Sequence, residues 1–170
     1  GRLAEMKARH LDPDVVSFSA SMGACAKTSR WKEALGVFSE ALLHGVEPDV
    51  VMHTAAISTC AQGVQWHDAL GMFLDMEARS VKPNTITYNA AISACANGAQ
   101  TDEAFGMLAH MRLRQLQPDI ITCSAAISAC AKGSCWQEAL DMLSGMRPSL
   151  LKPNMIACNA ALSACEKSAQ

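Results

Sequence analysis

Hydrophobic and polar positions along this chain repeat with a period of 35 residues. In each period one stretch places apolar side chains at helical spacing, as at Leu35 and Phe38 and again at Leu70 and Phe73. Acidic residues such as Glu40 occupy its other side, which is the pattern of an amphipathic helix. Because a fixed period of this size is typical of small units stacked side by side, the pattern predicts a repeat protein and not one closed globular core.

Prolines recur at the start of each period, and each is followed by a residue that favours the start of a helix. That residue is Asp or Asn, and both are good N-caps. A first helix is predicted to follow, as over residues 50–62, and a second helix begins at Trp31 or its equivalents. Pro148 should end the second helix of the fourth unit early. The recurrent prolines are Pro13, Pro48, Pro83, Pro118 and Pro153, and the residues that directly follow them are Asp14, Asp49, Asn84, Asp119 and Asn154.

The predicted fold class is all-α: a right-handed α-solenoid superhelix of 35-residue helix-turn-helix repeats, with the first helices lining its concave side. Both ends of the chain cut into the repeat, so a segment of a longer protein is expected. The predicted units are residues 1–14 (the end of a preceding repeat), 15–49, 50–84, 85–119, 120–154 and 155–170 (the first helix of a further, truncated repeat).

Composition and cysteine spacing restrict the class of protein. The chain is 50% hydrophobic with a net charge of −2, and its apolar runs are too short to span a bilayer. Five of the eight cysteines occupy one equivalent position, so stacked helices about 8–10 Å apart would hold them beyond disulfide reach. No Cys-x-x-Cys pair exists, so we expect no zinc, no other metal and no cofactor, and reduced, buried thiols in a reducing compartment. These cysteines are Cys25, Cys60, Cys95, Cys130 and Cys165.

One stripe of the first helix has an unusual composition. Six residues after each proline the chain carries Ser, Thr or Asn, although a solvated helix face favours Glu, Lys and Arg. On the same face, an aliphatic residue lies three positions earlier and a long or polar residue eight positions later. This composition favours a binding surface. The polar residues are Ser19, Thr54, Asn89, Ser124 and Asn159; the aliphatic residues are Val16, Val51, Ile86, Ile121 and Ile156; the long or polar residues are Lys27, Gln62, Asn97, Lys132 and Lys167.

Charged residues are also distributed unevenly between the first helices and the rest of the chain. The predicted first helices carry a net positive charge, and the remainder of the chain carries the excess of acidic residues. Acidic side chains are therefore kept off the first-helix face, which weakens the objection that an acidic chain should not bind nucleic acid. The first helices counted here are residues 15–27, 50–62, 85–97, 120–132 and 155–167.

The motifs resemble those of the pentatricopeptide repeat family. These are the period of 35, the Pro-Asp or Pro-Asn step, the Tyr-Asn-Ala-Ala-Ile-Ser-Ala-Cys first helix (Tyr88–Cys95), and a second helix that begins Trp/Thr-x-Glu/Asp-Ala-Leu/Phe. The resemblance covers almost the whole chain. It implies sequence-specific binding of single-stranded RNA, one base per repeat. It also implies a role in organellar RNA processing, stability, editing or translation, and hence a mitochondrion or plastid location.

The resemblance further implies which residues read each base. Base-reading pairs join the polar stripe residue of one repeat to the Asp or Asn after the next proline, and the aliphatic stripe residues sandwich the base. A carboxylate only accepts hydrogen bonds and suits the imino N–H of guanine or uracil, whereas an amide donor suits the ring nitrogen of adenine or cytosine. With Ser or Thr leaving room for a purine and Asn reaching a pyrimidine, the expected sequence is 5′-GAUA-3′. The pairs are Ser19 with Asp49, Thr54 with Asn84, Asn89 with Asp119, and Ser124 with Asn154; Asn159 has no partner in the chain and is expected to favour a pyrimidine; Lys27, Lys132 and Lys167 are the expected phosphate contacts.

Some positions depart from the recurrent pattern. Ala41 replaces the usual Met, and Thr101 replaces a recurrent Trp. Gln62 and Asn97 stand where a lysine would favour phosphate. Weaker RNA contact is therefore expected in the second and third repeats.

Two other classes of function compete with RNA binding. A protein-binding α-solenoid scaffold is the main alternative, and it predicts exposed aromatic side chains on the concave face. Most aromatic residues here fall instead at repeat-equivalent positions expected to be buried. A catalytic role would need a group such as a Cys60–His53 nucleophile pair, for which the sequence offers no third orienting residue. The chain is therefore not predicted to be an enzyme or to take a small-molecule substrate; single-stranded RNA is the expected partner and other proteins the alternative.

Overall fold

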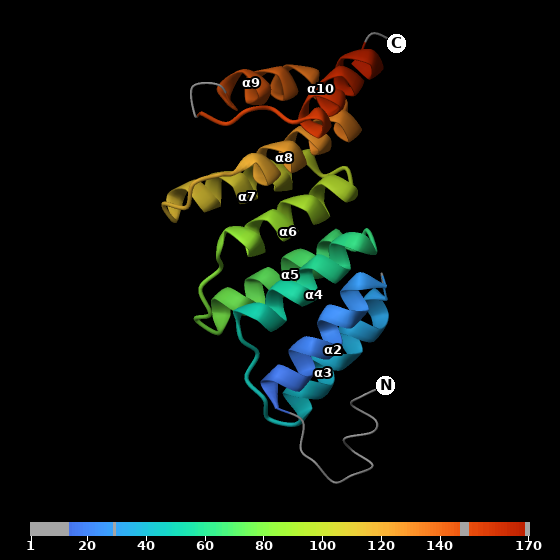
Figure 1. Ribbon diagram of the computed structural model, residues 1–170, viewed down its shortest axis with the longest axis vertical. Coiled ribbons are helices and arrows are strands. Elements are labelled where there is room, and N and C mark those ends of the chain that lie inside the picture. Colours follow the sequence, from blue (N-terminus) through green and yellow to red (C-terminus); the bar gives the residue numbers. More distant parts are fainter. Residues whose placement is uncertain (1–13, 29, 147–149, 169–170) are drawn as a thin grey trace. The chain divides into compact units, whose positions relative to one another are not determined.

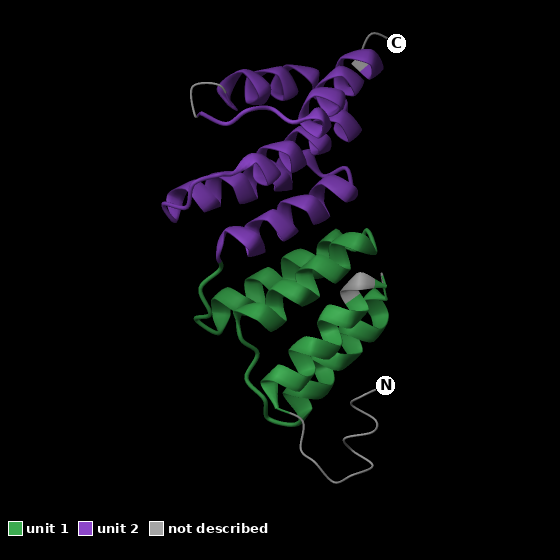
Figure 2. Ribbon diagram, in the orientation of Figure 1, with its two compact units in different colours: residues 1–83 green, residues 84–170 purple. Residues whose placement is uncertain are grey.

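The computed structural model describes residues 14–28, 30–146 and 150–168 (Figure 1). The described part divides into two compact units, unit 1 in residues 1–83 and unit 2 in residues 84–170 (Figure 2). All regular elements in these ranges are α-helices. They are α2 (Val15–Lys27), α3 (Trp31–Leu43), α4 (Val50–Gln62), α5 (Trp66–Ala78), α6 (Thr85–Asn97), α7 (Thr101–Leu113), α8 (Ile120–Gly133), α9 (Trp136–Met146) and α10 (Met155–Ser168).

The helices lie where the sequence predicts them. First helices begin directly after the Asp or Asn N-caps, and their ends differ from the prediction by at most one residue. The second helices α3, α5 and α7 each have 13 residues, and α9 is described from Trp136 to Met146. The early end predicted from Pro148 stays a prediction, because residues 147–149 lie outside the described residues. Residues 1–13, predicted to end a preceding repeat, also lie outside them.

Unit 1 packs two helix pairs around a core that includes Phe18, Phe38 and Met52. Its first helices α2 and α4 are in contact, and each also contacts α3. Ala41, which replaces the usual Met, is fully buried in this core. The small side chain thus fills an interior position and does not interrupt the packing.

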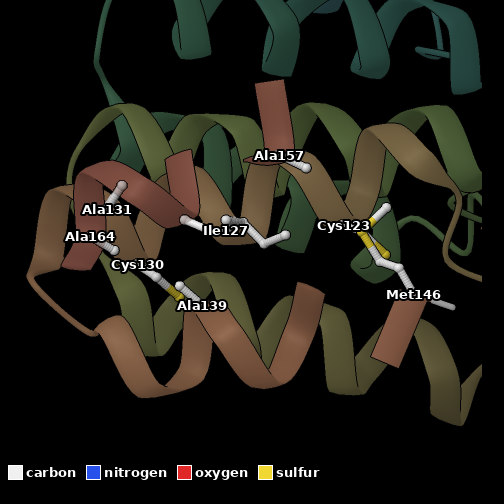
Figure 3. Packing of buried hydrophobic residues seen from close by; sticks show 9 residues of the cluster. Cys123, Ile127, Cys130, Ala131, Ala139, Met146, Ala157 and Ala164 are labelled. Carbon is white, nitrogen blue, oxygen red and sulfur yellow. The ribbon is translucent and has the colours of Figure 1, made fainter. Parts of the chain in front are cut away.

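Unit 2 places its first helices in one closely packed row. Helix α8 contacts both α6 and α10, and small buried residues such as Ala126, Ala157 and Ala164 line these contacts. Figure 3 shows the part of this core around Cys123 and Met146. Because alanine and cysteine are small, the helix backbones can approach closely.

The second helices of unit 2 are less closely packed, and a groove of about 820 Å³ lies beside them, lined in part by Phe105 of α7 and Met142 of α9. Its lining includes Cys123 and Gly145. One repeat earlier the equivalent positions hold Tyr88 and His110, whose side chains are hydrogen-bonded at 3.1 Å. The groove therefore lies where two small residues replace a large aromatic pair.

A buried histidine links the two helices of the second repeat. His53 is fully buried, and its Nδ1 lies 3.0 Å from the Asp49 carbonyl oxygen while its Nε2 lies 3.2 Å from Asp75 Oδ2. The sequence analysis was therefore wrong that no residue orients His53, because Asp75 does so. Both ring nitrogens are engaged by these two oxygens, which leaves neither of them for Cys60. The structure thus gives no support to a Cys60–His53 nucleophile pair.

All eight cysteines are free thiols. Burial raises the pKa of Cys60, Cys95 and Cys130 to about 11, with smaller contributions from nearby acidic groups. Since the thiolate is the reactive form, these three side chains are protonated and unreactive at neutral pH.

We therefore expect iodoacetamide to modify the partly buried Cys135 well before Cys60, Cys95 and Cys130 in the folded chain at pH 8. Labelling of the three buried thiols should accelerate as the pH rises toward 11, because each pH unit below the pKa lowers the thiolate fraction about tenfold. Peptide mass mapping measures both effects, and the urea-unfolded chain is the control. Equal labelling of Cys60 and Cys135 at pH 8 would contradict the burial described here.

Candidate nucleic-acid interface

Each first helix exposes a large aliphatic side chain at the same position, and α10 also exposes Leu162. The exposed fractions lie between 57% and 73%, although aliphatic residues elsewhere in these helices, such as Ile57, Ile92 and Ile127, are fully buried. The exposed residues therefore take no part in the core and are available for contact with a flat apolar partner. They are Val16 (73%), Val51 (58%), Ile86 (66%), Ile121 (57%) and Ile156 (63%).

The polar stripe residues differ in burial. Asn89 and Ser124 are only 8% and 6% exposed, Ser19 and Thr54 are half-buried, and Asn159 is exposed. Burial of Asn89 and Ser124 excludes the simple explanation that this stripe only faces solvent. Polar side chains with so little exposure need hydrogen-bond partners.

The Asp and Asn residues after the prolines cap the first helices with one oxygen each. Asp49 Oδ1 accepts from Met52 N at 2.8 Å, and Asn84 Oδ1 accepts from Thr87 N at 3.0 Å. Asn154 Oδ1 accepts from Ala157 N at 2.8 Å in the same way. Capping thus requires only Oδ1, and it leaves the second terminal atom, Oδ2 in Asp or Nδ2 in Asn, outside the cap.

Two of the predicted base-reading pairs are hydrogen-bonded pairs in unit 2. Asn89 Nδ2 donates to Asp119 Oδ1 at 3.2 Å and to Oδ2 at 3.1 Å. Ser124 Oγ lies 3.1 Å from Asn154 Oδ1 and 2.6 Å from the Ile120 carbonyl oxygen. Residues 30 positions apart in the chain are therefore brought together where the family resemblance implies.

The other two pairs differ from these. Ser19 Oγ is buried and has no hydrogen-bond partner among the residues that the structure describes, so it forms no hydrogen bond to Asp49. Thr54 lies in unit 1 and Asn84 in unit 2, and their pairing stays a prediction. Asn159 has no pairing residue after it within the chain.

Hydrogen bonds keep Asp119 ionised. Burial alone would raise the pKa of this carboxyl, but the Thr122 amide and hydroxyl, Asn89 and the Ile121 amide together hold its pKa below the usual value. At neutral pH Asp119 is therefore a carboxylate that accepts hydrogen bonds and cannot donate them.

The predicted phosphate contacts lie at the end of the stripe. Lys132 Nζ donates to Asn97 Oδ1 at 3.2 Å, and these two residues hold equivalent positions in successive repeats. Lys167 Nζ donates to the Ala131 carbonyl oxygen at 3.0 Å. Both lysines are exposed, so neither contact buries the ammonium group. The Lys27 side chain lies outside the described residues.

Thr122 is a residue of this site that the sequence analysis missed. Its hydroxyl contacts Asn89 Oδ1 and Asp119 Oδ1, and it accepts from Asp119 N at 3.1 Å. The signal available in the sequence was a threonine three residues after an Asp N-cap, which is the spacing of a capping box.

Family models match most of the chain. The pentatricopeptide repeat domain matches residues 36–98, the PPR repeat family matches residues 84–132, and the PPR repeat matches residues 16–46 and 121–147. The chain belongs to the pentatricopeptide repeat family. The predicted fold class of 35-residue helix-turn-helix repeats is confirmed with it.

Solved structures of pentatricopeptide repeat proteins share this fold. One is the pentatricopeptide repeat protein PPR10 in complex with an 18-nt psaJ RNA element, at 24% identity and a TM-score of 0.81 over 92% of this chain. This chain covers 23% of the PPR10 chain. Another is the PPR domain of Arabidopsis thaliana protein-only RNase P 1 in complex with tRNA, at 19% identity and a TM-score of 0.75, with coverage of 88% of this chain and 79% of that one.

A third similar structure is nuclear proteinaceous RNase P 2 from A. thaliana, at 13% identity and a TM-score of 0.75 over 91% of this chain and 35% of that one. No curated protein matches this chain closely enough to count as a relative.

Among the described residues, no helix has the length and apolar character needed to cross a membrane. Nor do the described His, Cys, Asp and Glu side chains form a group of three or more that could hold a metal ion.

Proposed function

We propose that this pentatricopeptide repeat segment binds single-stranded RNA with one base per repeat and prefers 5′-GAUA-3′. The observation that carries the proposal is that Oδ1 alone caps the helix, so the second terminal atom of each Asp or Asn stays outside the cap and can contact a base. In Asp119 this atom, Oδ2, also accepts from Asn89 Nδ2. Asp and Asn cap about equally well, so capping does not explain which of them occupies each repeat. The choice between Asp and Asn is explained if each repeat contacts a base that needs either an acceptor, which Asp supplies, or a donor, which Asn supplies.

The exposed aliphatic side chains supply a second, sequence-independent part of the binding. Val16, Val51, Ile86, Ile121 and Ile156 leave more than half of their surface exposed, and each lies three residues before a polar stripe residue. Bases pack against flat apolar surfaces whatever their identity, at about 1–3 kcal/mol each on aromatic platforms. Aliphatic side chains should contribute at the low end of that range.

Two of the similar structures are described as complexes with RNA, an 18-nt element in one and tRNA in the other. They support RNA as the class of partner. We propose no catalytic role for this segment, whose described residues form repeat helices and their connections. A role in organellar RNA processing, stability, editing or translation, and a mitochondrion or plastid location, are further parts of the proposal that rest on family membership.

The test is the affinity of the 170-residue chain for a short RNA that contains GAUA, compared with the same bases scrambled. We expect tighter binding of GAUA at low salt and a steep loss of affinity as salt rises, since each phosphate contact contributes about 0.7 to the logarithmic salt slope for single strands. Replacing both Lys132 and Lys167 with Gln should reduce that slope while keeping the preference for GAUA. If the chain binds no RNA at low salt, the proposal fails and a protein-binding scaffold becomes the better hypothesis.

A further inference from the structure

The Asn89–Asp119 pair includes a third side chain, and the three form a closed hydrogen-bonded ring. Asp119 N donates to Thr122 Oγ1, Thr122 Oγ1 contacts Asn89 Oδ1, and Asn89 Nδ2 donates back to the Asp119 carboxylate. Thr122 is fully buried and Asn89 is only 8% exposed. The geometry of this ring is therefore shielded from water and sensitive to the loss of any one member.

The single proton of the Thr122 hydroxyl has two possible acceptors. Asp119 Oδ1 already accepts from Ile121 N at 2.9 Å and from Thr122 N at 2.8 Å. Asn89 Oδ1 has no other donor within the described part of the chain. A buried carbonyl oxygen without a donor is costly, so the proton belongs on the bond to Asn89.

This bond and the bonds from Asn89 Nδ2 to Asp119 together fix which way the Asn89 amide faces. With Oδ1 turned to Thr122, the amide offers its N–H groups to Asp119 and to a base, and Asp119 Oδ2 beside it offers an acceptor. Uracil carries a carbonyl acceptor next to its imino donor, which matches this donor and acceptor. Cytosine carries an amino donor next to a ring-nitrogen acceptor, so both of its groups are mismatched.

We propose that Thr122 is a positioning residue that sets discrimination between uracil and cytosine at the third repeat. The inference rests on the proposed function, because it refines the base preference of the Asn89–Asp119 pair. Without the hydroxyl, only the bonds to Asp119 hold the Asn89 amide, so a turn that lets its Oδ1 accept from the cytosine amino group costs less. Thr122 lies three residues after the cap residue Asp119. The residues three positions after the cap residues Asp49 and Asn154 are Met52 and Ala157, which carry no hydroxyl.

The experiment uses four RNAs that contain GANA, with U, C, A or G at the third base, and compares the parent chain with Thr122→Val. We expect the U-to-C affinity ratio to fall about fivefold in the variant, which corresponds to the loss of one net hydrogen bond. Thr122→Ser should restore the ratio, and Thr122→Ala should lower it again if valine disturbs the helix. Thr87→Val removes the corresponding hydroxyl from the capping box of α6 and should leave the U-to-C ratio unchanged.

A purely structural role for Thr122 has a different signature. It would weaken binding of all four RNAs by the same factor and lower the thermal midpoint, with the U-to-C ratio unaltered. If the parent prefers U and Thr122→Val keeps that ratio, the inference is wrong while the proposed function stands. If the parent binds RNA but does not distinguish U from C, the assignment of the Asn89–Asp119 pair fails as well.

Discussion

Replacing Asn84 with Asp should change the preferred second base of the RNA from A to G. The Asn84 cap uses Oδ1, which accepts from Thr87 N and from the Thr87 hydroxyl at 3.1 Å, and a carboxylate oxygen can do the same. The substitution exchanges Nδ2, a donor that suits the ring nitrogen of adenine, for Oδ2, an acceptor that suits the imino N–H of guanine. With roughly 1–3 kcal/mol of discrimination per base, the preference should reverse by at least tenfold.

The measurement is the affinity of parent and Asn84→Asp chains for RNAs that contain GAUA and GGUA. Stability should stay within a few tenths of a kcal/mol, because Asp and Asn are nearly equal caps. Asp119→Asn is the reciprocal control, and it should shift the third base from U toward C while leaving the second base unchanged. The Thr54–Asn84 pairing is wrong if parent and Asn84→Asp both bind RNA and rank A and G in the same order.

Replacing Gly63 with Ala should destabilise the chain by about 1–3 kcal/mol, the usual cost of overpacking. Gly63 follows α4 with a φ of −80°, which any residue can adopt, so the backbone is not the obstacle. The obstacle is Trp31, because an added Cβ would lie 2.3 Å from its Cδ1 and 2.6 Å from its Cγ. Cγ and Cδ1 are the indole atoms closest to the Trp31 backbone and cannot swing aside easily. Either Trp31 or the end of α4 must therefore move.

Thermal unfolding followed by circular dichroism measures this effect, and Gly71→Ala is the matched control. Gly71 lies within α5 with nothing within 4 Å of an added Cβ. Its replacement should favour the helix, increase the free energy of unfolding by up to about 1 kcal/mol and so raise the midpoint. Opposite shifts are the expected result. A rise in the midpoint for both variants would show that Trp31 does not pack against Gly63 as described.

The sequence predicts the helices well because the signals for them are local. Each first helix has an Asp or Asn cap directly before it, and the apolar spacing that places Phe38 and Phe73 in the core is readable within a few residues. Repetition strengthens each of these signals, because a weak pattern that returns every 35 residues is hard to mistake.

The side-chain contacts of the site are less predictable because they join residues about 30 positions apart. Ser19 and Ser124 are identical and equivalent, yet Ser124 Oγ lies 3.1 Å from Asn154 Oδ1 while Ser19 Oγ has no partner in the described part of the chain. The Asn89–Asp119–Thr122 ring likewise depends on the rotamers of three side chains. Residue type and spacing show that such groups can meet, but the choice of partner follows from packing.

The one-atom cap described for Asp49, Asn84, Asp119 and Asn154 has a consequence for how such a chain can evolve. A single nucleotide change in a codon converts Asn to Asp, and because Oδ1 serves the helix in both residues, selection on folding does not oppose the exchange. On the proposed function, exchanges between Asn and Asp at these positions are therefore nearly neutral for helix capping and change the base that the repeat prefers. Lineages that share this architecture could acquire new RNA targets one repeat at a time without passing through unstable intermediates.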